Sequence, residues 1–523
     1  MTTDILPSHP ELDPPPTAHR SPLRLALYAV VVVLVLALIG GVTVAVRGLS
    51  GGGSQPEDVL PGGAFAFAKV DLDPSAGQKI NALRFMRKFP ALKDKVSLDA
   101  DLREALFEGV ADQAGWGELD FDDDVAPWLG SRVAVAAYGP AAGEPGPENV
   151  GPVPTIVVAL QVRDAGKARA GLDKLVAATP GAPEPGLVIQ DGYVLLAQDQ
   201  KTADKAAKDA EASVLSADEN FGSDLGALGD GVAAAWVDMD GLSSIAGMGR
   251  LSGLTGVGAF GLGGMNPAVP GGAGRSAYVL RFDGADAVEV RGAVTGANPL
   301  AGSTRKLRGF SDLPEDSVVA FGLAGGDQMI PGFFDGLRSM LDDMGEGGPQ
   351  GGFDGMVADA ERELGIELPE DLAVLLGSNL VGALQKGSLG GAGEFELGAR
   401  VTTDGPRAVA VIDKLRQAAR AQNEDFPVVR RLTEEGMIVA STQAQVDRLG
   451  ADGGLGDRDA VRKALPDVEE ASVALWVDFR GLIGEFTGAT TVDENLEPID
   501  GIGMTVQMRG TDAATYRLRL VVH

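Results

Sequence analysis

The densest group of potential metal ligands in the chain is the run Asp120–Asp124, in which four of five residues are aspartates. Closely spaced carboxylates are the ligands that calcium takes in helix-loop-helix sites. Such a loop needs glycine at its sixth position and glutamate at its twelfth, but counting from Asp120 these positions hold Val125 and Ser131. The calcium pattern therefore fails, and the run is interpreted as carboxylates that cap the N-terminus of a helix.

Aspartates at the ends of predicted strands form a second group with possible chemistry. Asp71, Asp238 and Asp478 each follow a valine that closes an apolar segment. Two carboxylates brought together from such places could hydrolyse a glycosidic bond. Because the Val-Asp pattern recurs in an internal repeat, capping or turn formation is favoured over catalysis. The nearby Trp236 and Trp476 are expected to pack in the core.

Histidine is too scarce for most side-chain catalysis. The chain of 523 residues has no cysteine and three histidines, of which His9 and His19 lie near the N-terminus and His523 is the last residue. A Ser-His-Asp, Cys-His or histidine-metal constellation is therefore not expected in the main part of the chain.

Two short motifs have weaker support. Gly256–Gly261 has the glycine spacing of a dinucleotide-binding loop, but no hydrophobic strand leads into it, which favours an ordinary loop. Ser75 and Lys79 leave serine-lysine chemistry open, although nothing marks this serine as activated. The sequence thus assigns no catalytic, cofactor-binding or metal-binding residue, and it predicts a protein that is not an enzyme.

The segments predicted to form the elements that position these groups occur twice in the chain, as an internal duplication. A residue found in both copies is expected to serve the shared fold, whereas a chemical group unique to one copy is the better candidate for function. No catalytic group stands out by that test. The matching segments are Trp128–Ser131 with Leu375–Ser378, Gly171–Val176 with Val411–Arg416, and Ala235–Asp238 with Leu475–Asp478.

Both copies predict the same order of strands and helices. Hydrophobic periodicity and turn residues indicate the following elements in the first copy: strands Ala64–Val70, Arg132–Tyr138 and Thr155–Val162, a hairpin Gly186–Ala197 turning at Asp191-Gly192, and helices Ala76–Arg87, Asp99–Val110 and Ala165–Ala178. The second copy repeats them as strands Ser317–Leu323, Asn379–Gln385 and Glu394–Val401, a hairpin Val428–Ser441 turning at Glu435-Gly436, and helices Phe333–Asp343, Gly355–Leu364 and Pro406–Ala421. This pattern predicts an α+β fold of two similar tandem domains with largely antiparallel sheets and packed helices.

A membrane anchor is predicted before the first copy. Leu25–Val46 is an uncharged, apolar run of 22 residues, and a helix of that length reaches about 33 Å, enough to span a membrane. Arginines before the run favour a cytoplasmic N-terminus and an extracytoplasmic main part. The predicted organisation is a disordered Pro-rich tail (1–23), a transmembrane helix (24–47), a Gly/Ser tether (48–55), repeat 1 (56–296), a linker (297–311) and repeat 2 (312–523).

The charge of the chain restricts its partners. The formal net charge is −30, and the three acidic and three basic residues before Gly48 cancel, so the extracytoplasmic part carries all of it. A negative field of this size opposes binding to nucleic acid. A soluble, solvated surface is the favoured interpretation of the excess acid.

The segment Leu60–Pro90, read with the apolar run and the tether, resembles a family of actinobacterial membrane proteins known as domain of unknown function 3352. The resemblance implies a Pro-rich tail, a single span and a cell-envelope location. It implies no activity, cofactor or catalytic residue.

Three functions are carried forward as expectations. The preferred one is a non-enzymatic envelope protein, a binding or scaffold protein that engages a partner or ligand at a cleft between the copies. The alternative is a carrier of a hydrophobic ligand such as a lipid or a wall precursor. A carboxylate-dependent glycan hydrolase that uses Asp71 and Asp238 is the third.

Overall fold

A computed structural model of the protein describes residues 54–71, 75–90, 103–104, 107, 111, 116, 118–140, 154–178, 184–244, 274–296, 303–343, 352–385, 397–422, 428–482, 496–510 and 512–523. The predicted tail, the apolar run Leu25–Val46, most of the predicted helix Asp99–Val110 and the glycine motif Gly256–Gly261 lie outside these residues. Within the part that is described, no helix has the length and apolar character needed to cross a membrane.

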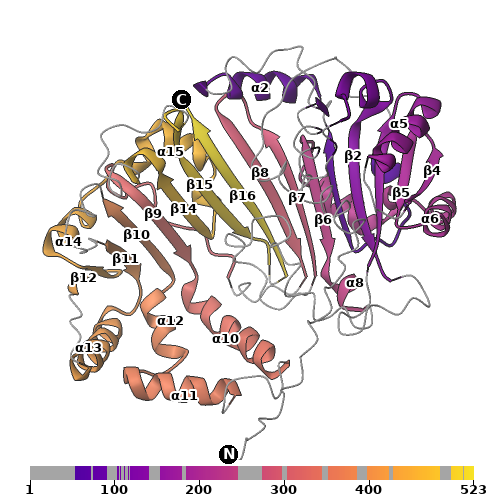
Figure 1. The fold of residues 1–523 in the computed structure, drawn as a ribbon. Coiled ribbons are helices and arrows are strands. Elements are labelled where there is room, and N and C mark those ends of the chain that lie inside the picture. The colour runs from indigo at the N-terminus through magenta and orange to yellow at the C-terminus, as the bar shows by residue number, and fades with distance from the viewer. Residues whose placement is uncertain are drawn as a thin grey trace, which may run out of the picture.

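Sixteen strands form one antiparallel sheet in which the two copies occupy opposite halves (Figure 1). The sheet order is β4-β5-β3-β2-β1-β6-β7-β8 across the first half, then β16-β15-β14-β9-β10-β11-β13-β12 across the second. The second half therefore repeats the strand order of the first, with β9 in the place of β1 and β16 in the place of β8. This confirms an α+β fold with a large antiparallel sheet and packed helices.

The strands are divided equally between the two halves of the sheet. The first half contains β1 (Ala66–Asp71), β2 (Leu129–Tyr138), β3 (Thr155–Val162), β4 (Gly186–Gln190), β5 (Tyr193–Ala197), β6 (Ala233–Asp238), β7 (Arg275–Phe282) and β8 (Ala287–Thr295). The second half contains β9 (Ser317–Ala324), β10 (Asn379–Gln385), β11 (Leu397–Thr402), β12 (Val429–Thr433), β13 (Gly436–Ala440), β14 (Val473–Asp478), β15 (Ile499–Met508) and β16 (Ala513–Val522).

The tight hairpins show why local sequence predicted them. Asp191 and Gly192 join β4 to β5 with φ of 49° and 80°. Positive φ at both central residues is the two-residue turn whose twist suits a hairpin, and Asp-Gly is among its preferred sequences. In the second half the turn lies at Glu434 and Glu435, one residue earlier than predicted, and Gly436 is the first residue of β13.

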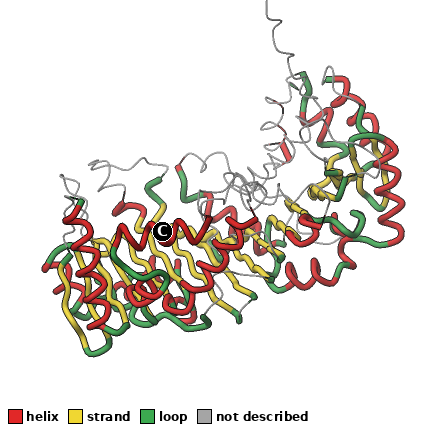
Figure 2. Tube along the Cα trace, turned by 90° about the horizontal axis from the view of Figure 1, so that it is seen from below, coloured by secondary structure: helices red, strands yellow, loops and turns green. Residues whose placement is uncertain are grey.

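Helices pack along the sheet, as the view from below shows (Figure 2). The first half has α2 (Ala76–Met86), α5 (Ala165–Ala177), α6 (Gln200–Ala212), α7 (Glu219–Gly226) and α8 (Met239–Ser244). The second half has α10 (Gly326–Asp343), α11 (Gly352–Leu364), α12 (Glu370–Leu376), α13 (Gly405–Ala421), α14 (Gln443–Leu449) and α15 (Asp459–Ala464). The predicted helices at α2, α5, α11 and α13 are confirmed to within a few residues, whereas α10 begins seven residues before the predicted Phe333.

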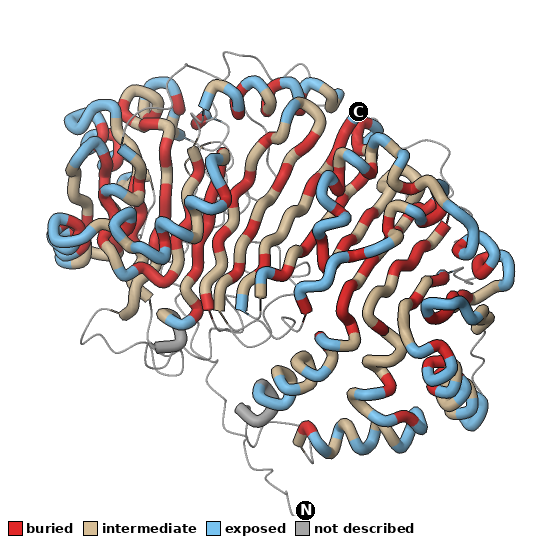
Figure 3. Tube along the Cα trace, turned by 180° about the vertical axis from the view of Figure 1, so that it is seen from behind, coloured by how far each residue is buried: buried red, intermediate tan, exposed pale blue. Residues whose placement is uncertain are grey.

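Each half has a core centred on a tryptophan. Trp236 and Trp476 are 2% and 0% exposed, which confirms that they pack inside the protein. Leu307 and Phe310, within the segment predicted as a linker, are also buried in the core of the second half. Buried and half-buried residues alternate along the central strands (Figure 3). Successive side chains of a strand point to opposite faces of the sheet, so this pattern is expected where one face is buried more deeply than the other.

The halves join through their last strands. β8 pairs with β16 along their whole lengths, from Ala513 opposite Thr295 to Val521 opposite Ala287. Arg291 lies opposite Arg517 in this ladder, and the two are equivalent positions. Their spacing, 517 − 291 = 226, is also that of Gly284 and Gly510, the positive-φ glycines that follow β7 and β15. The ladder is therefore centred on an approximate two-fold axis. The described residues meet edge to edge here, and not across the cleft between separate domains that the sequence suggested.

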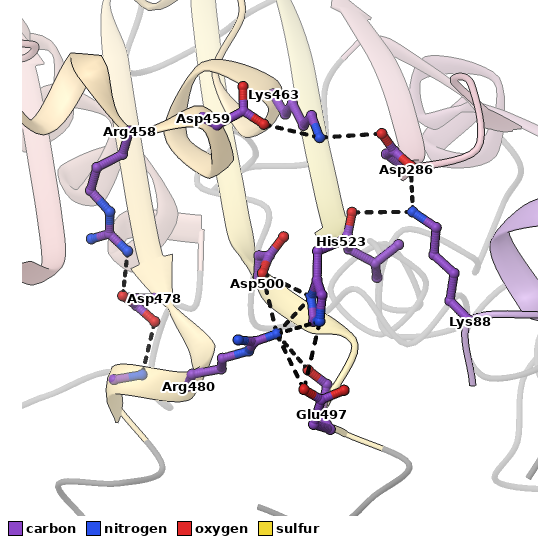
Figure 4. Close-up of polar contacts among 12 residues, drawn as sticks. Lys88, Asp286, Arg458, Asp459, Lys463, Asp478, Arg480, Glu497, Asp500 and His523 are labelled. Carbon is purple, nitrogen blue, oxygen red and sulfur yellow. Dashed lines mark hydrogen bonds and ion pairs between the residues drawn. The ribbon is translucent and has the colours of Figure 1, made fainter. Parts of the chain in front are cut away.

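Two acidic residues tie the junction together. Glu289 of β8 is 0% exposed and forms ion pairs with four arginines: Arg281, Arg291, Arg517 and Arg519. Asp286, in the turn before β8, pairs with Lys88 after α2 and lies 3.2 Å from Lys463 of α15 (Figure 4). The Lys88 ammonium, its strongest partner, and Lys463 hold the pKa of Asp286 below its usual range. Charges from both halves are thus neutralised across the shared ladder.

Candidate functional site in the first half

The aspartate run caps a helical turn, as predicted. The Asp120 side chain accepts a hydrogen bond from the Asp123 amide at 3.0 Å, and Asp124 forms an ion pair with Lys174 of α5. The second half repeats this pair, because Asp371 lies 2.8 Å from Lys414 of α13. An arrangement present in both copies serves the fold.

Two of the three strand-end aspartates are also caps. Asp238 accepts from the Gly241 amide at 2.9 Å, and Asp478 accepts from the Gly481 amide at 2.8 Å (Figure 4). Asp71 lies at the opposite end of the β1–β6 pair from Asp238, since its amide donates to the carbonyl of Val232. Six residues of strand separate the two ends by about 20 Å. The predicted hydrolase pair is therefore too far apart, because glycosidase carboxylates lie within about 10 Å of each other.

The remaining sequence candidates lie in two places. His523 lies 3.1 Å from Asp500 and 2.6 Å from Arg480, so its partners there are a carboxylate and a guanidinium rather than the hydroxyl or thiol that a histidine activates (Figure 4). Lys79 is 2% exposed, and its burial lowers its pKa despite the charge of Asp71. Ser75 is exposed at the start of α2, where its carbonyl accepts from the Lys79 amide.

A pocket of about 460 Å³ lies in the first half, on the sheet face covered by α7. A charged and polar wall comes from the N-terminal segment and β1, and the apolar part of the lining comes from α7, the following loop, β6 and β7. The residues that line it are Gln55, Glu57, Lys69, Asp71, Ser75, Ser216, Phe221, Gly222, Leu225, Gly226, Gly229, Asp230, Gly231, Val232, Ala233, Ala234 and Val279. Its volume is in the range of pockets that hold small ligands.

Ion pairs fix the charged wall. Lys69 of β1 lies 2.5 Å from Oε1 of Glu57 and donates to Gln55 at 3.3 Å. Next to it on the same strand face, Asp71 pairs with Arg132 at 3.0 Å. Burial opposes the charge of Arg132, but the bond to Asp71 outweighs it and raises the pKa of the guanidinium. Lys69, Asp71 and Arg132 are held in place by β1 and β2, and Glu57 by the short helical turn Pro56–Asp58.

The N-terminal end of the described chain is fastened beside this wall. The carbonyl of Ser54 accepts a hydrogen bond from Tyr193 at 2.7 Å and another from Arg132 at 3.3 Å. Tyr193 is fully buried, and this burial raises the pKa of its hydroxyl. Ser54 and Gln55, the last two residues of the predicted tether, therefore lie at the pocket and its charged wall.

The second half lacks the charged wall at the equivalent positions. The register pairs Asp71 with Arg132 in the first half and Ala324 with Asn379 in the second. The same spacing, 324 − 71 = 253, places Gly322 at the position of Lys69 and Phe310 at that of Glu57. A side chain at Gly322 would collide with Leu307 and Phe310, which fill this place with apolar packing. The charged wall is thus unique to the first copy.

The charged wall was not predicted from the sequence, although a comparison of the two copies is the test that reveals it. The groups come from three separate segments, and they are seen to be neighbours only when β1 is placed between β2 and β6. One signal was present in the sequence. At a constant spacing of 253 residues, the charged Glu57 and Lys69 of the first copy correspond to Phe310 and Gly322 of the second.

Comparison with known proteins gives one match. The model of the family described as "Protein of unknown function (DUF3352)" matches residues 26–185. The chain is similar to this family from the apolar run to the loop before β4, which confirms the resemblance expected from the sequence. No curated protein and no solved structure matches the chain.

Proposed function

We propose that the chain is a membrane-anchored, extracytoplasmic binding protein without enzymatic activity, and that the charged pocket of the first half is its ligand site. The observation that carries the proposal is the difference between the copies. One copy keeps Glu57, Lys69 and Asp71 around a pocket, while the other fills the same place with Phe310, Gly322 and Ala324. A charged wall that the shared fold does not need is best explained by a ligand.

The state of the charged groups supports binding more than catalysis. Glu57 is paired with Lys69, and Asp71 is paired with Arg132. Charges that neutralise one another in fixed positions suit the orientation of a ligand. A general base or nucleophile needs an available lone pair and a partner that activates it.

The proposed location rests on the N-terminal segment. Leu25–Val46 has the length and composition of a span, and residues 48–53 connect it to Ser54 at the pocket. Six residues reach at most about 22 Å. The ligand site would therefore face the zone next to the membrane.

The carrier hypothesis remains the alternative class. A carrier for a lipid needs an apolar interior space, whereas Trp236 and Trp476 occupy the centres of the two described cores. Filled centres favour a rigid scaffold with a pocket at its surface.

The test is native mass spectrometry of the full chain, purified from its source in nanodiscs. Gly222 lines the pocket and has open space at its Cβ, so Gly222→Phe would obstruct the pocket without touching its charges. Gly77 in α2 also has open space but lies outside the pocket, so Gly77→Phe is the matched control.

We expect a small polar molecule to accompany the wild-type chain and the Gly77→Phe chain, and to be lost from Gly222→Phe. A lipid retained by all three chains would support the carrier instead. A ligand retained equally by all three at another site would refute the proposed pocket.

A further inference from the structure

The polar atoms of the pocket point to its ligand class, on the basis of the proposed binding function. We infer that the pocket takes a neutral sugar ring. The reasons are an adjacent donor and acceptor, apolar residues elsewhere in the lining and a local charge that disfavours ions of either sign.

The donor and acceptor are Lys69 and Glu57. Oε1 of Glu57 lies 2.5 Å from the Lys69 ammonium and can accept a second hydrogen bond, whereas Oε2 is buried away from solvent and has no hydrogen-bond partner among the described residues. The ammonium carries three N–H groups, and its bonds to Gln55 and Glu57 use two of them. A hydroxyl group donates and accepts at once, so neighbouring hydroxyls of a sugar match this pair.

Another part of the lining is apolar. Phe221 and Leu225 of α7 line the pocket together with Val232 and Val279. A pyranose ring has hydroxyls at its rim and C–H groups on its faces, so it can place its rim on the charged wall and a face on this apolar part. Ser75 and Ser216, which also line the pocket, add hydroxyls that can adapt to either role.

The local charge argues against charged ligands. Lys69 balances Glu57 and Arg132 balances Asp71, so Asp230 is in excess at the pocket, and the whole chain carries −30, so an anion is repelled. A cation would be attracted to the chain, but at Glu57 it would approach the ammonium of Lys69 at close range. A neutral, hydroxyl-rich ligand avoids both penalties.

The experiment is saturation-transfer NMR on the full chain in nanodiscs. The probes are glucose and N-acetylglucosamine as neutral sugars, glucosamine as the cation and glucuronate as the anion. We expect the neutral sugars to bind at least ten times more tightly than the charged ones. Tighter binding of glucosamine or glucuronate would overturn the inference.

Variants locate the binding. Glu57→Gln and Gly222→Phe should each weaken neutral-sugar binding at least tenfold, while Gly77→Phe leaves it unchanged. Thermal unfolding of each variant verifies that it is folded, and Gly222→Phe keeps the test valid if Glu57→Gln is unstable.

Two failures can be told apart. If native mass spectrometry finds a ligand of another class that Gly222→Phe removes, the sugar inference is wrong and the binding function stands. If sugars bind the wild type and Gly222→Phe equally, both the inference and the proposed pocket are refuted.

Discussion

Replacement of Glu289 by glutamine is expected to destabilise the whole molecule, because this side chain neutralises the junction between the halves. Its carboxylate is 0% exposed and has ion pairs with Arg281, Arg291, Arg517 and Arg519. Glutamine keeps the volume but removes the charge. The ion pair between Asp283 and Arg519, at 2.6 Å, is unaffected, so part of the positive charge of the arginines remains balanced.

The size of the effect follows from burial. Removing one partner of a buried ion pair costs roughly 3–5 kcal/mol. The four guanidinium side chains are between 9% and 33% exposed, so water can recover part of this loss. We therefore expect a decrease of about 3 kcal/mol in the free energy of unfolding. With a urea slope of about 3 kcal/mol/M, the unfolding midpoint would fall by about 1 M.

The assay is urea unfolding followed by circular dichroism. Asp327→Asn is the control, because the Arg305–Asp327 pair is exposed and should contribute about 0–1 kcal/mol. Equal midpoints for Glu289→Gln and the wild type would refute the view that this carboxylate stabilises the junction.

Of two further predictions, the first uses the internal duplication as a control and the second compares two pH values. Gln200 bonds both the amide and the carbonyl of Leu187 at 3.1 Å and so seals the edge strand β4, and Gln200→Ala should increase aggregation measured by light scattering. Gln443, which bonds Asp447 of its own helix, should tolerate alanine better, and equal aggregation would contradict the sealing role. Burial would raise the pKa of Asp371, but Lys414 and an amide outweigh it and lower the pKa, so the pair stabilises above the unfolded-state pKa of about 3.9. This stability is lost as pH falls through the folded-state pKa, so Asp371→Asn should lower the unfolding temperature at pH 7 more than at pH 3, and an equal effect at both would contradict it.

Local features of this fold could be predicted from the sequence because their causes are local. Asp191 and Gly192 specify a two-residue turn by their own conformational preferences. Asp120 and Asp238 cap the backbone within three residues of themselves. Such signals recur along the chain in the same order, and this recurrence is what reveals the duplication.

The junction and the pocket could not be predicted in the same way. The β8–β16 ladder joins residues more than 200 positions apart, and no turn or spacing signals which of the sheet edges will pair. The pocket depends on this kind of non-local order too, because Glu57 and Phe221 approach each other only across the assembled sheet. The difference between the two copies is visible in the sequence, but only the strand register shows that the residues that differ lie together around a pocket.

The central claim is that the two copies share one sheet through β8 and β16, and an engineered disulfide tests it most directly. The chain has no cysteine, so a pair introduced at Ala293 and Thr515, which lie opposite each other, has no competing thiol. Cysteines at Ala293 and Ala513, two residues out of register, are the control. We expect mild oxidation of the full chain to link the first pair nearly completely and the second pair far less, measured by mass spectrometry of the digested protein. Failure of the first pair to link, or equal linking of both, would contradict the shared sheet.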